Sequence, residues 1–317
     1  MRSTNCEPGL NTAPNKAVTY SAILTTFNAQ TNIINAVNAI LEQSVQAREI
    51  IIVDDMSTDA TVIILNESFS HLSNLRIISN ESNSGQSHSR NIAAQFSTSD
   101  LLIFFDDDDI SLSERASEHI RMFESGADFN FVSSIKKYPN SYEVLCQNED
   151  RNVEKLDAVA LLKRLSLGEQ ANTLGKVWIP ASTSAIGRSF FHSVGGFDTE
   201  MRRLEDAEIV VRAARSGCRG AWSSKILVHR ASTQSSLKGG VLEMDYEKKF
   251  VLKFQDMFTK ADLHRAMKLI EIRRAYFSKK RARLIFLSCT SPSLLFGPHG
   301  RLLAFFKRLA HDRRQKK

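Results

Sequence analysis

Four consecutive carboxylates, Asp106 to Asp109, follow the apolar run Leu101–Phe105. Carboxylates held this close repel one another, and ionised groups beside an apolar core are costly unless cations compensate them. Hard divalent cations such as Mg²⁺ or Mn²⁺ take oxygen ligands and commonly bridge a substrate phosphate. The run therefore predicts a metal site. A solvated acidic turn that caps the next helix is the alternative interpretation.

Polar residues also follow other apolar segments. Thr25–Asn28 and Asp54–Asp59 each come at the end of a predicted strand, and Asn83–Asn91 leads into a predicted helix. Ligands of an open parallel sheet bind beyond the carboxyl ends of its strands. We therefore expect these segments to meet the acidic run at one edge of the sheet.

The sequence lacks the usual glycine-rich phosphate loops. No G-x-G-x-x-G follows the first predicted strand, which argues against a dinucleotide cofactor. No G-x-x-x-x-G-K-[ST] is present either, since Gly175-Lys176 is followed by Val177. A diphosphate at this edge would be held through a metal and side chains, which suits a nucleotide-sugar.

Together the segments resemble the family 2 inverting glycosyltransferases, which have the GT-A fold. The resemblance implies an α/β protein with a mostly parallel sheet flanked by helices, and a nucleotide-diphospho-sugar donor used with Mg²⁺ or Mn²⁺. It covers residues 18–229. The matching motifs are TTFN at 25–28, VDDxSxD at 53–59, NxGxxxxRN at 83–91, FDxDD at 105–109, and GGFD at 195–198 followed by LED at 204–206.

The resemblance also implies which residues contact the donor. Thr25, Phe27 and Asp55 match contacts to the base and ribose. Arg90 matches a further donor-side contact, and Asp106 belongs to the nucleotide-sugar site as the first carboxylate of the family's D-x-D.

For the metal, the resemblance points to Asp108 as the direct ligand. Asp107 departs from the usual pattern and leaves the choice of ligand ambiguous. Ser113 also departs from the pattern, at a position where proline is frequent, but this change affects no proposed role. A histidine near the position of His229 completes the metal shell or meets the phosphates in many relatives, so His229 is a candidate ligand; a purely structural histidine is the alternative.

The catalytic base implied by the resemblance is Asp206, which would remove the proton of the acceptor hydroxyl. Transfer with inversion needs such a base within hydrogen-bond reach of that hydroxyl. Asp206 opens a predicted helix at 205–215, whose dipole would favour the ionised form. The alternative is that Glu205 and Asp206 are ordinary acidic residues of a helix N-terminus.

Four further residues are weaker candidates. Trp178 and Trp222 would either stack on sugar rings or pack in the core. Ser182 and Ser184, on the strand before the GGFD motif, would face the donor sugar.

Hydrophobic periodicity predicts the elements that position these groups. Strands alternate with helices in the first half, which implies right-handed βαβ units and a parallel sheet. Ser111-x-x-Glu114 is a capping-box pattern for the helix that follows it. The predicted strands are 19–26, 49–54, 75–79, 100–106, 129–136, 182–187 and 220–229, and the predicted helices are 33–41, 59–71, 85–96, 113–125, 157–167 and 205–215.

Charge separates the chain into regions. The net charge is +7, and residues 245–317 alone contain 19 Lys and Arg against 6 Asp and Glu, so the remainder is mildly acidic. We expect a flexible N-terminal arm (1–17), a GT-A domain (18–240) and a basic helical tail (241–317). Within the domain, 18–110 would bind the nucleotide and 111–240 the acceptor.

Scattered cysteines without metal spacing are typical of a reducing compartment, and the sequence has no apolar run of the roughly 20 residues needed to cross a bilayer. These features favour a cytoplasmic protein.

Residues 241–283 have the pattern of one long amphipathic helix or a bent pair, followed by short apolar clusters flanked by Lys and Arg. Such a tail predicts peripheral binding to an anionic membrane at the inner face of the cell; a helical extension packed on the domain is the alternative. No nucleic-acid-binding fold is recognised, so nucleic acid is not an expected partner.

The predicted function is inverting transfer of a sugar from a UDP- or dTDP-sugar to a hydroxyl of a glycan or lipid-linked acceptor, in the synthesis of lipopolysaccharide, capsule or exopolysaccharide. A nucleotidyltransferase on a similar fold is one alternative, but it would need a glycine- and Lys/Arg-rich loop after the first strand, where TTFNAQTN stands. A non-catalytic nucleotide-sugar-binding module is the other, and such a module would not need Asp206.

Overall fold

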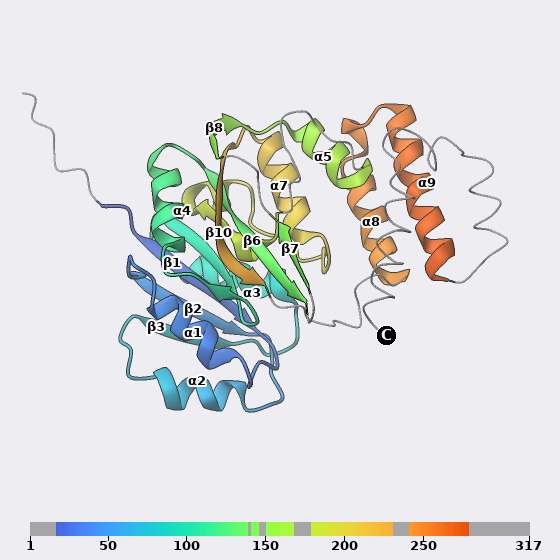
Figure 1. Ribbon diagram of the computed structural model, residues 1–317. Helices are drawn as coiled ribbons and strands as arrows, with labels where there is room; N and C mark the ends of the chain where they lie inside the picture. The colour runs from blue at the N-terminus through green and yellow to red at the C-terminus, as the bar shows by residue number, and fades with distance from the viewer. Residues whose placement is uncertain (1–16, 139–140, 146–149, 168–178, 231–240, 279–317) are drawn as a thin grey trace, which may run out of the picture.

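The computed structural model describes residues 17–138, 141–145, 150–167, 179–230 and 241–278, which form one large mixed sheet with helices on both faces (Figure 1). The strands are β1 Tyr20–Thr26, β2 Glu49–Asp54, β3 Leu75–Ser79, β4 Leu101–Asp106, β5 Ile110–Ser111, β6 Phe129–Tyr138, β7 Ser141–Leu145, β8 Arg151–Lys155, β9 Ser184–Gly187 and β10 Arg219–Arg230. The helices are α1 Ile33–Leu41, α2 Thr61–Phe69, α3 Gln86–Phe96, α4 Arg115–Glu124, α5 Ala158–Leu167, α6 Arg188–Ser193, α7 Glu205–Arg215, α8 Val241–Lys253 and α9 Lys260–Phe277.

Strand directions bring the ends of distant segments together. Four parallel strands lie in the order β3-β2-β1-β4, and the sheet continues through β9, β6, β10 and β5. β9 is antiparallel to both β4 and β6, and β10 is parallel to β6. The carboxyl ends of β1, β2, β4, β6 and β10 therefore lie at the same edge of the sheet.

The parallel half of the sheet is buried on both faces. In β2, Ile51 and Val53 belong to the core that includes α3, α5 and α7, whereas Ile50 and Ile52 belong to the core that includes α1, α2 and α4. A parallel sheet covered by helices on both faces requires such a continuous apolar strand. The α/β architecture and the parallel first half expected from the sequence are confirmed.

Some elements differ from the sequence prediction. The short strands β5, β7 and β8 and the helix α6 were not predicted. The capping box is wrong: α4 begins at Arg115 without a side-chain cap, and the Ser111 hydroxyl accepts a hydrogen bond from Arg115 Nη1 at 2.8 Å. The reason is that β5 pairs with β10, which draws Ser111 into the sheet and away from the helix N-terminus.

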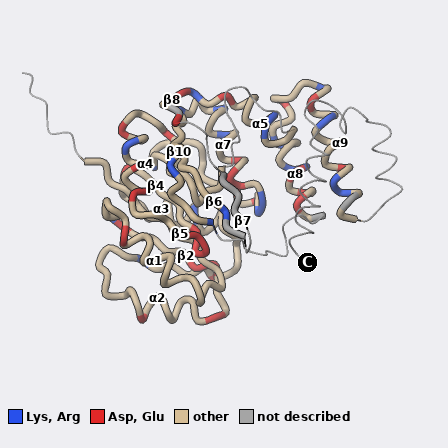
Figure 2. The backbone as a smooth tube through the Cα atoms, viewed as in Figure 1, with Lys and Arg blue, Asp and Glu red and all other residues tan. Residues whose placement is uncertain are grey.

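Between residues 241 and 278 the chain forms two helices with a break between them, which matches the bent pair rather than the one long helix. α8 and α9 lie beside α5, on the side of the molecule away from α1 and α2 (Figure 1). Buried apolar side chains of both helices, Phe250 and Leu269 among them, share a core with α5 and α7. Lys and Arg recur along α8 and α9 between acidic residues (Figure 2).

Several predicted features lie outside the described residues. These are the arm up to residue 16, Trp178, and the apolar clusters beyond residue 278. Among the helices that the structure describes, none is both long and apolar enough to traverse a lipid bilayer.

Candidate active site

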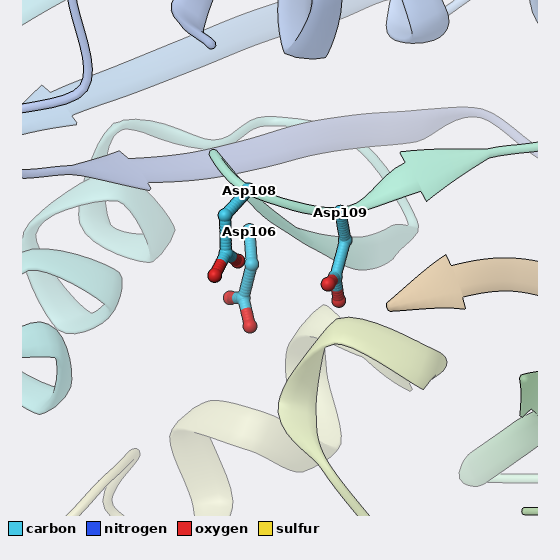
Figure 3. A group of neighbouring side chains, drawn as sticks. All are labelled: Asp106, Asp108 and Asp109. Atoms are coloured by element: carbon cyan, nitrogen blue, oxygen red, sulfur yellow. The ribbon is translucent and has the colours of Figure 1, made fainter. Parts of the chain in front are cut away.

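Three of the four consecutive carboxylates converge after β4. Asp106, Asp108 and Asp109, here called the acidic cluster, each contribute one carboxylate oxygen to a group whose members lie within 4.8 Å of one another. Their side chains point into the same space (Figure 3). Opposite oxygen ligands of Mg²⁺ are separated by about 4.2 Å, which lies within this limit. The acidic cluster thus fits a hard divalent cation, through oxygen donors that Mg²⁺ and Mn²⁺ prefer.

Asp107 makes a different contact. Its Oδ2 accepts a hydrogen bond from the backbone N–H of Phe27 at 3.2 Å, at the end of β1. Burial, together with the charge of Asp106, raises the pKa of Asp107 to about 6. Asp107 therefore joins the turn after β4 to β1 and is not a member of the acidic cluster, whose third member is Asp109.

Asp109 is the most buried member of the acidic cluster, with 8% of its surface exposed. Burial and the neighbouring charge of Asp106 raise the pKa of Asp109 to about 6. The guanidinium of Arg230 opposes this rise, and its Nε lies 3.6 Å from Asp109 Oδ2. From the sequence, Asp109 was expected only as part of the acidic run, without a role of its own, and no role was expected for Arg230.

A buried arginine connects the acidic cluster with the predicted base. The Arg90 side chain is 2% exposed, and its Nη2 lies 2.9 Å from Asp106 Oδ1. Its Nη1 lies 3.4 Å from Glu205 Oε1 and 3.7 Å from Asp206 Oδ1. Arg90 was expected to contact the donor. The structure places its guanidinium between carboxylates of β4 and α7, so it holds the two parts of the site together.

Asp206 lies in the first turn of α7, directly after a strained backbone. Leu204, the residue that precedes the helix, has a left-handed φ of 62°. The Asp206 side chain is 30% exposed, and its Oδ1 makes no hydrogen bond to any described residue. Burial and the adjacent Glu205 raise the pKa of Asp206, while Arg90 opposes the rise. A carboxylate with a raised pKa and an oxygen that makes no hydrogen bond is suited to act as a general base.

The ends of β1 and β2 present polar atoms that the described residues leave without partners. Thr25 Oγ1 and Asp54 Oδ1 are buried and make no hydrogen bond in the described part of the chain. The side chains of Phe27 and Met56 beside them are each 47% exposed. Buried polar groups normally have a partner, so this edge is suited to a ligand with both polar and flat apolar surfaces. Asp54 was not among the predicted contacts.

Asp55, which was predicted to contact the base, is largely occupied by the protein itself. Its Oδ1 accepts hydrogen bonds from Asn80 Nδ2 and Ser84 N, and its Oδ2 accepts one from Gly85 N, each at 2.8 Å. A carboxylate has about four acceptor positions, so about one remains. Asp55 therefore shapes the loop before α3 and keeps limited capacity for a ligand.

His229 is exposed and does not belong to the acidic cluster. It pairs with Ile110 of β5, and the next residue, Arg230, faces Asp109 instead. Successive residues of a strand point to opposite sides, which explains why the two neighbours diverge.

Of the weaker candidates in the described part of the chain, Trp222 and Ser184 make their contacts elsewhere, whereas Ser182 lies beside the acidic cluster. Trp222 is 3% exposed and stacks on Phe131 with ring centroids 5.3 Å apart, so it is a core residue. The hydroxyl of Ser184 donates to Ala181 O at 2.8 Å. Ser182 is fully buried, and its hydroxyl lies close enough to the Asp109 carboxylate to oppose the rise in the pKa of that group.

Comparison with known proteins gives a family for this site. The sequence model of the family described as Glycosyl transferase family 2 matches residues 21–188. A protein of Haemophilus influenzae described as an uncharacterized glycosyltransferase is 27% identical over 193 residues, which are 61% of this chain and 60% of that protein. The Escherichia coli enzyme UDP-Glc:alpha-D-GlcNAc-diphosphoundecaprenol beta-1,3-glucosyltransferase WfgD is 29% identical over 40% of this chain and 47% of its own length. The matches thus span about half of these relatives.

Solved structures share the fold. Residues 1–349 of Staphylococcus aureus TarS in complex with UDP-GlcNAc align with a TM-score of 0.61 at 16% identity, over 85% of this chain and 79% of that one. GalNAc-T7 with UDP, GalNAc and Mn²⁺ aligns with a TM-score of 0.56 at 17% identity, over 75% of this chain and 48% of that one.

Proposed function

Because the chain belongs to glycosyl transferase family 2 and has the GT-A fold, we propose that it transfers a sugar from a nucleotide-diphospho-sugar to an acceptor hydroxyl with inversion. The observation that carries the proposal is the pair of contacts made by Arg90, which ties Asp106 of the acidic cluster to Asp206. A donor site and a base must lie on either side of the same sugar carbon, and this link supports that arrangement.

The donor in this proposal is a UDP- or dTDP-sugar whose nucleoside binds at the ends of β1 and β2. Thr25 and Asp54 offer the polar atoms without partners, and Phe27 offers an exposed ring for the base. The similar TarS and GalNAc-T7 structures contain UDP or UDP-GlcNAc, which favours a uridine nucleotide.

The cofactor in this proposal is Mg²⁺ or Mn²⁺, held by Asp106, Asp108 and Asp109. When bound, such a cation neutralises the negative charge that grows on the leaving diphosphate. His229 is not included, because it lies outside the acidic cluster.

The chemical step assigns the base role to Asp206. Its carboxylate takes the proton of the acceptor hydroxyl while that oxygen forms a bond to the anomeric carbon. The bond between this carbon and the diphosphate oxygen breaks on the opposite side, and its electron pair leaves with the nucleoside diphosphate. Attack opposite to the leaving group inverts the configuration at the anomeric carbon.

The acceptor class follows from relatives rather than from the site. Similar proteins include enzymes named for teichuronic acid and amylovoran biosynthesis, besides WfgD. We therefore assign this chain to surface polysaccharide synthesis on a glycan or lipid-linked acceptor, at the cytoplasmic face of the membrane. Flotation with anionic liposomes checks the membrane association, which a protein remaining in the soluble fraction would contradict.

The test is a panel of UDP- and dTDP-sugars assayed for nucleotide release with an acceptor extract, with Mn²⁺ or with EDTA. We expect release with one donor and loss of release with EDTA. Asp206→Asn is expected to reduce turnover by about 10²- to 10⁴-fold, the usual contribution of a general base, with UDP affinity nearly unchanged.

Glu200→Gln is the matched control. Glu200 lies in the same segment as the base, is an exposed acid paired with Lys249, and its variant is expected to keep full turnover. Turnover by Asp206→Asn close to that of the wild type would exclude Asp206 as the base. Donor binding without any transfer would favour a binding module.

A further inference from the structure

Arg230 is the last residue of β10, and its strand ends at the edge where the acidic cluster lies. β10 is parallel to β6, and both β6 and β4 are antiparallel to β9, so β10 and β4 end on the same side. The topology therefore places the guanidinium of Arg230 beside the acidic cluster, which lies more than a hundred residues earlier in the chain.

The contact that Arg230 makes there is incomplete. Its Nε lies 3.6 Å from Asp109 Oδ2, which is beyond hydrogen-bond distance. This Nε is buried and has no hydrogen-bond acceptor among the described residues, although the side chain as a whole is 18% exposed. A buried donor without an acceptor is destabilising, so a ligand that offers an anionic oxygen would be stabilised here.

Two other arginines near the acidic cluster, Arg90 and Arg115, already have hydrogen-bond partners in the protein. Arg90 contacts Asp106, Glu205 and Asp206, as described above. Arg115 is fully buried and donates to Phe104 O and Ser111 Oγ. Arg230 differs from both, because it is partly exposed and approaches a single carboxylate loosely.

The neighbouring strand adds positive charge beside Arg230. Lys136 of β6 is its register partner in the parallel pair. Directly opposed residues on adjacent strands point to the same face, so Lys136 adds to the positive potential on the face that carries Arg230, although it is also the register partner of Glu143 in β7. Both positive charges stand at the edge where a donor's phosphates would meet the acidic cluster.

We propose that Arg230 binds the terminal phosphate of the nucleoside diphosphate, on the side of the acidic cluster formed by Asp109. The inference rests on the proposed function, since it concerns the donor of that reaction. A guanidinium presents a planar fork of N–H donors that matches the spacing of phosphate oxygens. The imidazole ring of the neighbouring His229 does not have this fork of donors. Arg230 thereby stabilises the leaving group.

The experiment compares diphosphates with monophosphates. Calorimetric titrations of UDP, UMP, dTDP and dTMP in the presence of Mn²⁺ are made with the wild type, Arg230→Met and Arg230→Lys. We expect Arg230→Met to weaken diphosphate binding about tenfold or more, as for the loss of a hydrogen bond to a charged group, and to change monophosphate binding less than about twofold. Arg230→Lys is expected to fall between.

Lys225→Met is the matched control. Lys225 lies on the same strand, carries the same charge, and is a 57% exposed residue paired with Glu118, so its variant is expected to bind both ligands like the wild type. Circular dichroism verifies the fold of each variant. If Arg230→Met does not fold, the ratio of diphosphate to monophosphate affinity in Arg230→Lys decides.

The outcomes separate the two proposals. A wild type that binds no diphosphate overturns the proposed donor and, with it, this inference. If the wild type binds diphosphate and the Arg230 variants bind it equally well, the role of Arg230 alone is overturned. The same conclusion follows if these variants lose diphosphate and monophosphate affinity in equal measure.

Discussion

Arg90 shows how much of this site depends on a single buried charge. The acidic cluster and Asp206 are carried by different elements, and Arg90 contacts both while being almost completely removed from solvent. Ionised groups in such surroundings are stable only when they are paired with opposite charges. The arginine and its carboxylates are therefore mutually dependent.

Replacement of Arg90 is expected to be strongly destabilising. Arg90→Met leaves Asp106, Glu205 and Asp206 without their counter-charge, and breaking a buried ion pair typically lowers the free energy of unfolding by about 3–5 kcal/mol. Arg90→Lys keeps the charge without the planar fork and should lie in between. Urea denaturation measures these losses.

Arg215→Met is the control, since Arg215 is 54% exposed and pairs with Asp256, which is 55% exposed. Its loss should stay below about 1 kcal/mol. An Arg90→Met protein as stable as this control would show that the carboxylates do not need Arg90.

His119 predicts a pH dependence of stability. It is fully buried, its Nε2 accepts a hydrogen bond from Arg115 Nε at 3.4 Å, and its Nδ1 lies 2.6 Å from Asn130 Oδ1. Burial and the charge of Arg115 lower the pKa of His119 to about 3, with weaker opposing effects from Asn130 and Glu118. The ring is therefore neutral in the folded protein.

An unfolded histidine has a pKa of about 6.5, so below that pH the unfolded chain binds a proton that the folded protein does not. Stability should fall between pH 6.5 and 3, by about 2 kcal/mol at pH 5 relative to pH 7.5. His119→Gln should lose this part of the dependence. Urea denaturation at pH 5 and pH 7.5 measures the change in the free energy of unfolding, and His71→Gln, at an exposed position, is the control. An equal loss of stability at pH 5 in the wild type, His119→Gln and His71→Gln would contradict the role of His119.

At the scale of elements, the segment before α7 is fixed to α3. The side-chain amide of Asn91 donates to Phe197 O and accepts from Phe197 N, both at 2.8 Å. This pair of bonds anchors the turn at Gly195 and Gly196, from which the chain continues to Asp206. The GGFD motif thus positions Asp206 through the backbone.

The two glycines allow a matched test. Both have a positive φ, 82° at Gly195 and 68° at Gly196. A Cβ added at Gly196 would lie 2.6 Å from Asn91 Oδ1, whereas a Cβ added at Gly195 would meet no atom within 4 Å. Gly195→Ala should destabilise by about 1–2 kcal/mol through left-handed backbone strain. Gly196→Ala should lose about 1–3 kcal/mol more, because Asn91 must move. Equal losses in urea denaturation would show that Asn91 does not restrict the turn.

At the scale of the whole molecule, α8 and α9 belong to the same apolar core as α5 and α7. Ion pairs add to this packing, since Lys253 contacts both Asp198 and Glu208. The described part of the basic region is therefore packed on the domain, whatever surface the rest of the chain engages.

Unfolding is expected to be one transition that includes these helices. Phe250 is 2% exposed, and Phe250→Ala should reduce the free energy of unfolding by about 3–5 kcal/mol, whereas Leu242→Ala, at a 50% exposed position, should lose less than about 0.5 kcal/mol. The loss should be the same by far-ultraviolet circular dichroism and by tryptophan fluorescence, because both tryptophans precede α8. A change seen only by circular dichroism would mean that the helices unfold separately.

The sequence by itself determined the alternation of strands and helices, the parallel half of the sheet, and the edge at which the acidic run and Thr25 are gathered. These features follow from hydrophobic periodicity and from the direction of parallel strands, which local sequence encodes. The family could also be recognised from the sequence, because several of its motifs lie at those strand ends.

The tertiary structure alone decided which neighbour in each motif faces the site. Asp109 rather than His229 completes the acidic cluster, Arg90 binds carboxylates, and Asp54 keeps the free oxygen. In β10, register shifts between Ser223 and Ile226 and between Ile226 and Val228 reset the alternation before Arg230. A one-residue change of register moves a side chain to the opposite face, and sequence periodicity does not reveal where such shifts occur.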